Sequence, residues 1–376
     1  MIRLTYRTQT LLLIIISTIF SFAVLNRWIV TDLGMLSYGR IWQLFINYSD
    51  FGFTRRAFIG TLLSITPIHD LFKNEYIFAL FVHHAAIALL SILIALHINK
   101  TPNFSFSAKA ALILSPALII QSSYSTGSLD VFVLIIAAIN ILYVKNIYIL
   151  SFSIFAGILT HELFIFTIPA QFASFFIKQN LHSRDLNRIF KVLWIPTVTT
   201  VISVAVLALF GKTNLQQTEF ENIMKEIIPG AAYDHGLWSG YREVGSTFEE
   251  NARSISLIFT VLTDNIVYII VPIIYVILLI KLAAQNAKNR TVSIIVIFSS
   301  LFPLLAYLVA TDLYRWIGMS ANMAILLLLV IGSEKPLKYA KWHIVALALF
   351  VILAPFGGAE LNRPFPMHQF ILERIP

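Results

Sequence analysis

Long apolar runs alternate with short polar connections along most of this 376-residue chain. A helix needs about 20 apolar residues to cross the hydrocarbon core of a bilayer, and a short or re-entrant span needs fewer. We therefore predict an all-α fold, a single polytopic transmembrane domain over residues 1–376. This criterion gives about eleven spans, at 9–29, 77–97, 108–123, 129–144, 147–160, 163–177, 192–210, 255–280, 291–309, 316–332 and 342–356.

The composition agrees with a membrane protein. Hydrophobic residues make up 58% of the chain and charged residues 12%, against roughly 45–50% and about 25% in a soluble domain. The net charge of +8 does not indicate nucleic-acid binding, because the basic residues are scattered between apolar runs rather than gathered on one face. The chain has no cysteine, which excludes disulfides, thiolate metal sites and thiol nucleophiles.

Basic residues predict the orientation, because short cytoplasmic connections of membrane proteins are rich in Lys and Arg. The N-terminus is predicted to be cytoplasmic, with an uncleaved first span, because no small-residue cleavage site follows the first apolar run. If the spans then alternate, two long segments, 30–76 and 211–254, lie outside with the C-terminus. The inside connections hold most of the basic residues, namely Arg3, Arg7, Lys100, Lys145, Lys178, Arg184, Arg188, Lys191, Lys281, Lys288, Arg290, Lys335, Lys338 and Lys341.

This alternation requires that residues 147–177 cross twice. About 31 residues separate Lys145 from Lys178, enough for two short helices of about 15 residues each that meet at Thr160-His161-Glu162. A single tilted helix is the alternative, and it would reverse the direction of every later segment. We favour the hairpin, because it keeps the later lysines inside.

One stretch after the first span carries candidate chemistry, Tyr48-Ser-Asp-Phe-Gly-Phe-Thr-Arg-Arg-Ala-Phe-Ile-Gly60. It places Asp50 five and six residues before Arg55 and Arg56. Charged residues at a membrane boundary are costly unless they are solvated, paired or used. An acid beside two guanidinium groups suggests a site for an anionic, lipid-linked substrate. The alternatives are that Asp50 caps a helix N-terminus and that the arginines contact lipid head groups.

Other ionisable residues are predicted at the same outer face. Asp130 opens one span, His161 and Glu162 form the hairpin tip, and Asp312 and Arg315 precede another span. An enzyme that acts on a lipid head group needs such convergence, whereas a pump more often places its acids at mid-membrane. The structural alternatives are an i,i+3 ion pair between 312 and 315 and a simple turn at 161–162. Candidate catalytic residues are therefore Asp50, His161, Glu162 and Asp312, and candidate phosphate-binding residues are Arg40, Arg55, Arg56 and Arg315.

The second outer segment, 211–254, is acidic and aromatic. Trp and Tyr rings offer flat apolar faces with polar edges, which suit sugar rings, although such residues are also ordinary at membrane interfaces. We predict that acceptor binding involves Tyr233, Trp238, Tyr241 and Arg242.

This arrangement resembles the GT-C superfamily of polytopic glycosyltransferases, which take sugars from polyprenyl-phosphate donors. The resemblance rests on a first span, a long outer segment holding an acid, many further spans and later outer loops. It implies that Asp50 is the general base, that Arg55 or Arg56 binds donor phosphate, and that Asp312 and Arg315 line the cleft. It also implies a bacterial cytoplasmic membrane, a periplasmic active face, and a polyprenyl-phosphate- or pyrophosphate-linked sugar as partner in surface-glycan assembly.

The chain departs from some members of that superfamily, because segment 30–76 has no paired Asp-Asp or Asp-Glu, and the chain has no Trp-Trp-Asp. We therefore predict no metal ligands and no cofactor, with a divalent metal as the alternative. The size, the aromatic content and the outer loops are also similar to Wzy-type O-antigen or capsule polymerases.

The residues are also compatible with two other functions. A flippase for lipid-linked glycans, or another transporter, would need a basic cavity at mid-membrane. An acyl- or phosphoethanolamine-type transferase would use His161 as its base. A cytoplasmic nucleotide-sugar site is not predicted, because no Gly-rich phosphate loop is present.

Overall fold

The computed structural model describes residues 5–25, 40–68, 71–72, 74–101, 104–122, 126–179, 186–229, 236–246, 260, 262–263, 266–310 and 312–353. All regular elements in these ranges are helical, which confirms the predicted all-α fold. They are α1 (Tyr6–Leu25), η1 (Ile41–Leu44), α2 (Tyr48–Phe51), α3 (Ala57–Ser64), α4 (Glu75–Ile98), α5 (Phe106–Ile113), α6 (Ile119–Ser122), α7 (Asp130–Leu142), α8 (Ile147–Thr160), η3 (Glu162–Thr167), α9 (Ile168–Lys178), α10 (Leu186–Phe210), α11 (Gln217–Ile227), α12 (Gly236–Gly245), α15 (Ile266–Gln285), α16 (Arg290–Leu301), η5 (Phe302–Leu308), α17 (Leu313–Glu334) and α18 (Lys341–Leu353).

Four helical stretches in the described part of the chain are long and apolar enough to cross a membrane: Glu75–Ile98, Ile189–Phe210, Arg290–Leu308 and Leu313–Glu334. Shorter apolar helices accompany them, including α7 and α8. A water-soluble protein would not expose an apolar helix such as α10, whose Val201 and Leu209 are 63% and 74% exposed. These apolar helices indicate a membrane protein. By length alone they account for fewer crossings than the eleven predicted.

Helix α17 lies at the centre of the bundle. Its side chains from Leu313 to Gly332 are buried almost without interruption, and it packs against α15, α16, α9 and α7. A helix that is apolar on all sides and surrounded by others is a core helix rather than a lipid-facing one. Polar residues on this helix are therefore held among protein side chains, which matters for the site described below.

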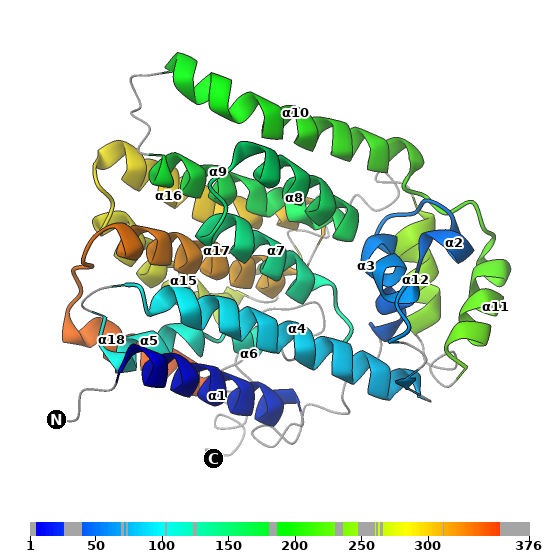
Figure 1. Ribbon diagram of the computed structural model, residues 1–376, viewed down its shortest axis with the longest axis horizontal. Helices are drawn as coiled ribbons and strands as arrows, with labels where there is room; N and C mark the ends of the chain where they lie inside the picture. The colour runs from blue at the N-terminus through cyan, green and yellow to red at the C-terminus, as the bar shows by residue number, and fades with distance from the viewer. Residues whose placement is uncertain are drawn as a thin grey trace.

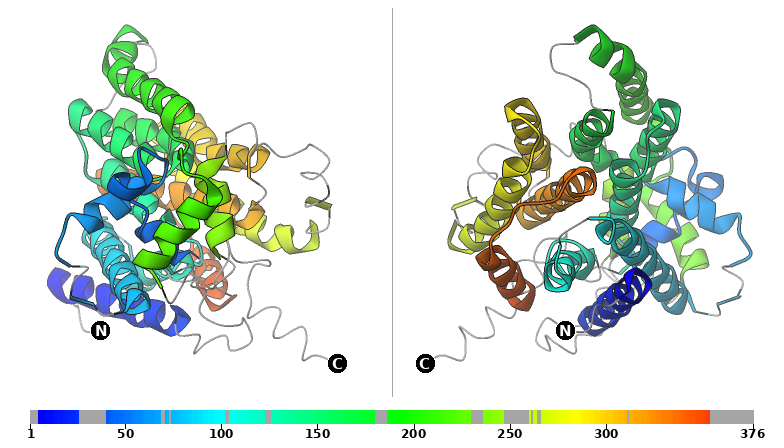
Figure 2. Two further views of the ribbon diagram at one scale, coloured as in Figure 1. Left: turned by 90° about the vertical axis from the view of Figure 1, so that its right-hand side faces the viewer. Right: turned by 60° about the vertical axis from the view of Figure 1, so that its left-hand side comes forward.

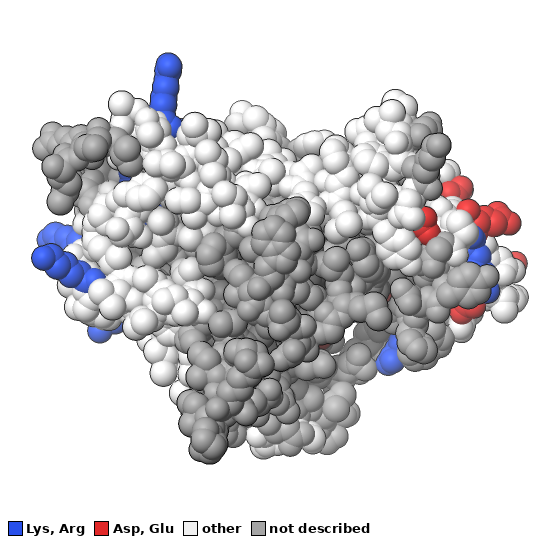
Figure 3. All heavy atoms as spheres, turned by 90° about the horizontal axis from the view of Figure 1, so that it is seen from below, with Lys and Arg blue, Asp and Glu red and all other residues white. Residues whose placement is uncertain are grey.

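The long helices run roughly along one axis, so that the bundle has two ends (Figure 1). At one end, Lys109 Nζ donates to Gln9 Oε1 at 3.0 Å and to Asn99 Oδ1 at 2.8 Å. At the same end, Asn286 Nδ2 donates to the carbonyl oxygen of Lys338 at 3.0 Å. Lys and Arg side chains gather at this end on the face shown in Figure 3, and the Asp and Glu side chains gather at the other.

The segment after α7 turns back on itself, as predicted. His161 has extended backbone angles (φ −162°, ψ 128°) and ends α8, and η3 and α9 follow it. The end of α9 then returns to the start of α8. Lys178 Nζ donates to the carbonyl oxygen of Val144 at 2.9 Å, and Gln179 Nε2 donates to that of Lys145 at 3.1 Å. These contacts confirm the hairpin geometry of 147–178 and rule out a single straight helix.

The described parts of the two segments predicted to lie outside, called here the first and second outer segments, fold together into one lobe. It lies at the end of the bundle opposite the connection between α17 and α18 (Figures 1 and 2). The lobe contains η1, α2 and α3 from the first segment, and α11 and α12 from the second. Trp42, Phe51, Phe220 and Met224 form its apolar core. The rings of Phe51 and Phe220 lie 5.1 Å apart between centroids, a distance typical of packed aromatic pairs.

Gly127 allows the start of α7 to approach the lobe. Its φ is +82°, and a Cβ atom there would lie 2.6 Å from the Cα atom of Ile41. Gly52 also has a positive φ, +69°, but a Cβ atom there would meet nothing within 4 Å. We expect Gly127→Ala to lose about 1–3 kcal/mol more unfolding free energy than Gly52→Ala, because only the first adds overpacking to backbone strain. Thermal unfolding of both variants in one detergent would test this, and equal losses would contradict the close approach.

Candidate functional site

An uninterrupted chain of charged side chains connects the lobe to the bundle. Arg40 and Arg56, from the first outer segment, both pair with Glu243 of α12. Arg56 also binds Glu162 of η3, with Nη2 2.5 Å from Oε1 and Nε 3.2 Å from both carboxylate oxygens. Such fork-shaped contacts are the strongest that guanidinium and carboxylate groups make. The lobe and the hairpin tip are thereby held together by buried charge.

The chain continues through the hairpin tip to α17. His161 Nδ1 lies 3.3 Å from Glu162 Oε2, and the other ring nitrogen, Nε2, lies 3.2 Å from Nη2 of Arg315. Arg315 can only donate, so Nε2 accepts from it. Nδ1 also accepts the backbone N–H of Leu163 at 3.2 Å, so the ring receives donors at both nitrogens, with the Glu162 carboxylate beside Nδ1. Arg315 also pairs with Asp130 of α7, and its Nη1 lies 3.4 Å from Oδ2 of Asp312.

Backbone contacts fix Asp130 at the start of α7. Its N–H donates to Ser128 Oγ at 3.3 Å, and the preceding N–H, of Leu129, donates to Gln43 Oε1 at 3.2 Å. Gln43 in turn donates to Glu243 at 3.3 Å. The first turn of α7 is therefore held by the same lobe residues that hold the ion pairs, and the position of Asp130 depends on the lobe being in place.

Burial and pairing shift the pKa values at the hairpin tip in opposite senses. Burial alone would raise the pKa of Glu162, but the guanidinium of Arg56 and the neighbouring His161 keep it well below its usual range. The pKa of Glu243 is lowered too, because Arg56 and Arg40 outweigh its burial. Burial lowers the pKa of His161, against the attraction of Glu162. Near neutral pH the site therefore holds ionised carboxylates and a neutral imidazole.

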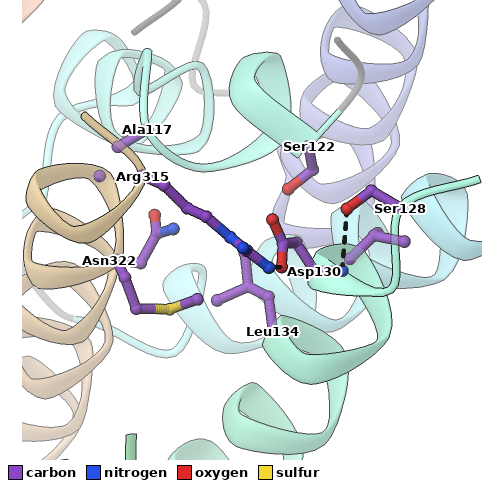
Figure 4. A pocket seen from close by; sticks show the side chains of 10 residues that line it. Ala117, Ser122, Ser128, Asp130, Leu134, Arg315 and Asn322 are labelled. Atoms are coloured by element: carbon purple, nitrogen blue, oxygen red, sulfur yellow. Dashed lines mark hydrogen bonds and ion pairs between the residues drawn. The ribbon is translucent and has the colours of Figure 1, made fainter. Parts of the chain in front are cut away.

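A pocket opens beside the last members of this chain, between the turn that follows α5, α6, α7 and α17. Figure 4 shows Arg315 and Asp130 pointing toward one another across it, with Ser122 and Ser128 on the Asp130 side. Its cavity volume is about 30 Å³, room for about two water molecules or one small polar group. Ala117, Val131, Leu134, Gly318, Met319 and Asn322 line the remainder.

Asp50 lies outside the charged chain. Six of the twelve predicted site residues belong to that chain, namely Arg40, Arg56, His161, Glu162, Asp312 and Arg315. The carboxylate of Asp50 is exposed and accepts from Asn47 Nδ2 at 2.7 Å, and Asn47 Oδ1 accepts its backbone N–H at 2.9 Å. It thus belongs to the first turn of α2, where Asn47 is the N-cap. No described contact joins it to Arg55, Arg56 or the pocket. The alternative that Asp50 itself caps the helix is wrong, because Asn47 holds that position and Asp50 lies in the first turn.

Arg55 faces away from its neighbour Arg56. Its side chain is buried, and Nη2 donates to the carbonyl oxygen of Ser246 at 2.5 Å, while its backbone N–H donates to that of Gly211 at 2.9 Å. These bonds tie both ends of the second outer segment to the first. The structure therefore divides the two arginines, with Arg56 in the charged chain and Arg55 holding the lobe together.

The predicted acceptor residues do not meet at a described surface. Tyr241 packs inside the lobe, its ring 5.7 Å from that of Phe220 and its hydroxyl 3.3 Å from the carbonyl oxygen of Leu215. Arg242 is exposed on α12. Tyr233 and the side chain of Trp238 lie outside the described residues.

The described part of the chain contains no group of three or more His, Asp or Glu side chains that could hold a metal ion. The sequence reasoning gave no role to Asp130, Gln43 or Glu243. For Asp130 a signal existed, since it is an acid at the start of an otherwise apolar span. Glu243 is one of many acids in its segment, and only its place in the fold distinguishes it.

Acid is expected to destabilise the hairpin tip. Because burial puts the pKa of His161 below the ~6.5 of an exposed histidine, the unfolded chain binds a proton that the folded chain does not, and stability falls as the pH drops below about 6.5. The lowered pKa values of Glu162 and Glu243 add a second loss, below about 4.5. Melting temperatures from pH 7.5 to 4 should fall in both ranges. In His161→Asn, the melting temperature should fall less steeply between pH 7.5 and 5 than in the wild-type protein, and as steeply below that range. Equal slopes for the two proteins between pH 7.5 and 5 would contradict this assignment.

Comparison with known proteins adds no relative, since no protein-family model, curated protein or solved structure matches the chain significantly.

Proposed function

We propose that this protein is an integral-membrane glycosyltransferase or polymerase that uses a polyprenyl-phosphate- or pyrophosphate-linked sugar at the outer face of the membrane. The observation that carries the proposal is the pocket in which a carboxylate, Asp130, and a guanidinium, Arg315, from different helices face one cavity. Transfer of a sugar from a phosphate needs one group that accepts a proton and one that stabilises the departing phosphate.

The proposed topology has eleven crossings, with the N-terminus in the cytoplasm of a bacterium and the pocket on the periplasmic side. The hydrogen bonds that join Lys109 to Gln9, and Lys178 to Val144, bring connections predicted to be cytoplasmic to one end. The charged chain and the lobe lie at the opposite end. Short helices such as α8 and α9 would then cross as a pair, with Ile149 and Phe152 of α8 facing lipid.

In the proposed reaction, Asp130 takes the proton of the acceptor hydroxyl through the carboxylate oxygen that Arg315 does not hold. The acceptor oxygen forms a bond to the anomeric carbon, and the bond from that carbon to the phosphate oxygen breaks. The electron pair leaves with the phosphate. Protonation of Asp130 removes the charge that pairs with Arg315 at the moment when charge grows on the phosphate, so that Arg315 can exchange one partner for the other.

The N–H groups of Arg315 support this exchange of Asp130 for phosphate. Its Nε is buried and has no hydrogen-bond partner among the described residues, and its Nη1 makes only a long contact with Asp312. A guanidinium group stays protonated and binds phosphate with two nitrogens. The pocket contains a single cation, next to a carboxylate, which favours this reaction over the basic transport cavity that a flippase needs.

The histidine supports the second candidate, an acyl- or phosphoethanolamine-type transferase. Glu162 and His161 form a carboxylate–imidazole pair, an arrangement that prepares a histidine to act as a base. His161 is only 1% exposed, however, and its Nε2 is occupied by Arg315, so the base would have to be uncovered first.

Reconstitution into sealed liposomes would test the proposal. The purified protein would receive polyprenyl-phosphate- and polyprenyl-pyrophosphate-linked sugars extracted from its host, together with host glycan acceptors. We expect loss of the lipid-linked sugar and a new covalent glycan product, detected by mass spectrometry, with free polyprenyl (pyro)phosphate released. Movement of the lipid-linked sugar between leaflets without a covalent product would contradict the proposal and indicate a flippase.

A further inference from the structure

Asn322, in the lining of the pocket, has a side-chain oxygen, Oδ1, without a hydrogen-bond partner among the described residues. The residue is only 5% exposed. An unpaired amide that is buried costs free energy comparable to a lost hydrogen bond. Such a group needs an explanation, and a ligand that completes its hydrogen bonds would supply one.

The position of Asn322 on α17 relates it to the charged mouth. Arg315, Gly318, Met319 and Asn322 recur at helical spacing and line one wall, and seven residues of helix separate the first and last Cα atoms by about 10 Å. Figure 4 shows Asn322 and Arg315 pointing from α17 into the same space. Because Gly318 has no side chain, the wall between them is left open.

The part of the lining away from Arg315 does not favour a charged ligand group. Its members include the apolar Ala117, Leu134 and Met319, and Asp130 and Arg315, the charged residues that line the pocket, pair with each other. A carboxylate or ammonium group placed there would be buried without a counter-charge, which costs far more than burying a hydroxyl that is hydrogen-bonded. A neutral group that donates a hydrogen bond fits both the walls and the Asn322 amide.

We propose that Asn322 is a specificity-determining residue whose Oδ1 accepts a hydrogen bond from a hydroxyl that an uncharged sugar ring inserts into this pocket. The inference rests on the proposed function and names its substrate class: neutral sugars are accepted, and uronic acids are rejected. A site built to hydrogen-bond a substrate hydroxyl discriminates strongly against the analogue that lacks it, because the site's own polar group is then left unpaired.

Binding of methyl glycosides would test this without requiring transfer. The full-length protein in lipid nanodiscs, where no glycoside detergent competes, would be titrated with the methyl pyranosides of glucose, galactose, mannose and N-acetylglucosamine, and with methyl glucuronide, by saturation-transfer NMR. Asn322→Leu keeps the side-chain volume and removes the amide. Ser320→Ala is the matched control, because Ser320 is buried on the same helix with an unpartnered hydroxyl but does not line the pocket.

We expect at least one neutral pyranoside to bind the wild-type protein, at least tenfold more weakly to Asn322→Leu, and unchanged to Ser320→Ala. Monodeoxy derivatives of that sugar, each lacking one hydroxyl, would then be titrated. One of them should bind the wild-type protein and Asn322→Leu with equal affinity, and the hydroxyl that it lacks is the one that Asn322 binds. Equal binding by Asn322→Leu, preferred binding of the glucuronide, or no binding of any neutral pyranoside would overturn the inference. Covalent transfer in the liposome assay would still stand in each of these cases, so the two failures are distinguishable.

Discussion

Replacing Arg56 with alanine is expected to lower the free energy of unfolding by about 3–5 kcal/mol, because it leaves the partly buried Glu162 without its guanidinium partner and Glu243 with Arg40 alone. The Arg56 side chain is 10% exposed and binds Glu162 through three contacts and Glu243 through one. Arg56 is a main cause of the low pKa of both carboxyl groups, so its removal also lets burial raise those pKa values. Denaturant titration of the purified protein would measure the change.

The backbone at Arg56 makes a second comparison informative. Its φ is +67°, the one positive value among the described residues other than glycine. A side chain in that region costs about 1–2 kcal/mol, whereas glycine adopts it freely. We therefore expect Arg56→Gly to be more stable than Arg56→Ala by about 1 kcal/mol, the reverse of the usual order within a helix. The strain is retained because this backbone directs the guanidinium toward both acids.

A double variant separates the lost ion pair from lost packing. Arg56→Gly with Glu162→Gln also removes the carboxylate that has lost its guanidinium partner, and we expect part of the stability to return. Lys212→Ala, an exposed cation in the same lobe, is the control and should change stability by less than about 0.5 kcal/mol. A double variant no more stable than Arg56→Gly would show that the charged chain contributes nothing to the fold.

The features that the sequence predicted well depend on local pattern. The hairpin at 147–177 followed from the distance between two basic residues, and the contacts of Lys178 with the end of α7 show why: a lysine at a helix end satisfies carbonyl oxygens there. The pattern did not predict the interruptions within spans. The predicted span 108–123 breaks between α5 and α6 around Pro116, and 291–309 changes to a 3-10 helix at Pro303.

Only part of the site was predicted from the sequence. Residues that are close along the chain were expected to be close in space, and this was not always so. Asp50 lies near Arg56 along the chain, but a local side chain, Asn47, satisfies its carboxylate, while Arg56 takes its partners from residues 106 and 187 positions away. Asn322 carried no signal, because one amide in an apolar helix is usually a polar contact between helices. Its missing partner is visible only once the surrounding helices are placed.

The largest functional effect is expected from Asp130→Asn. General-base catalysis typically contributes 10²–10⁴-fold, so the initial rate of transfer in liposomes should fall by about that factor. Asparagine has nearly the same shape and can still accept the hydrogen bond from Arg315, so the helix and the pocket should remain intact. It leaves Arg315 with Asp312 as its counter-charge, so the melting temperature should fall, and the rate is compared per folded protein. Asp50→Asn should keep a rate within about twofold of the wild-type protein, because its carboxylate lies outside the charged chain.

Two further variants decide between the remaining assignments. Asp312→Asn removes a more exposed carboxylate at 3.4 Å from the same arginine and should reduce the rate by about tenfold or less. His161→Asn should leave substantial transfer if Asp130 is the base, because the imidazole acts only through Arg315. Loss of activity in Asp50→Asn with normal turnover in Asp130→Asn would instead place the base where the glycosyltransferase resemblance puts it. Activity that depends on His161 and not on either aspartate would favour the acyl- or phosphoethanolamine-type reaction, because the base would then be the imidazole that Glu162 supports.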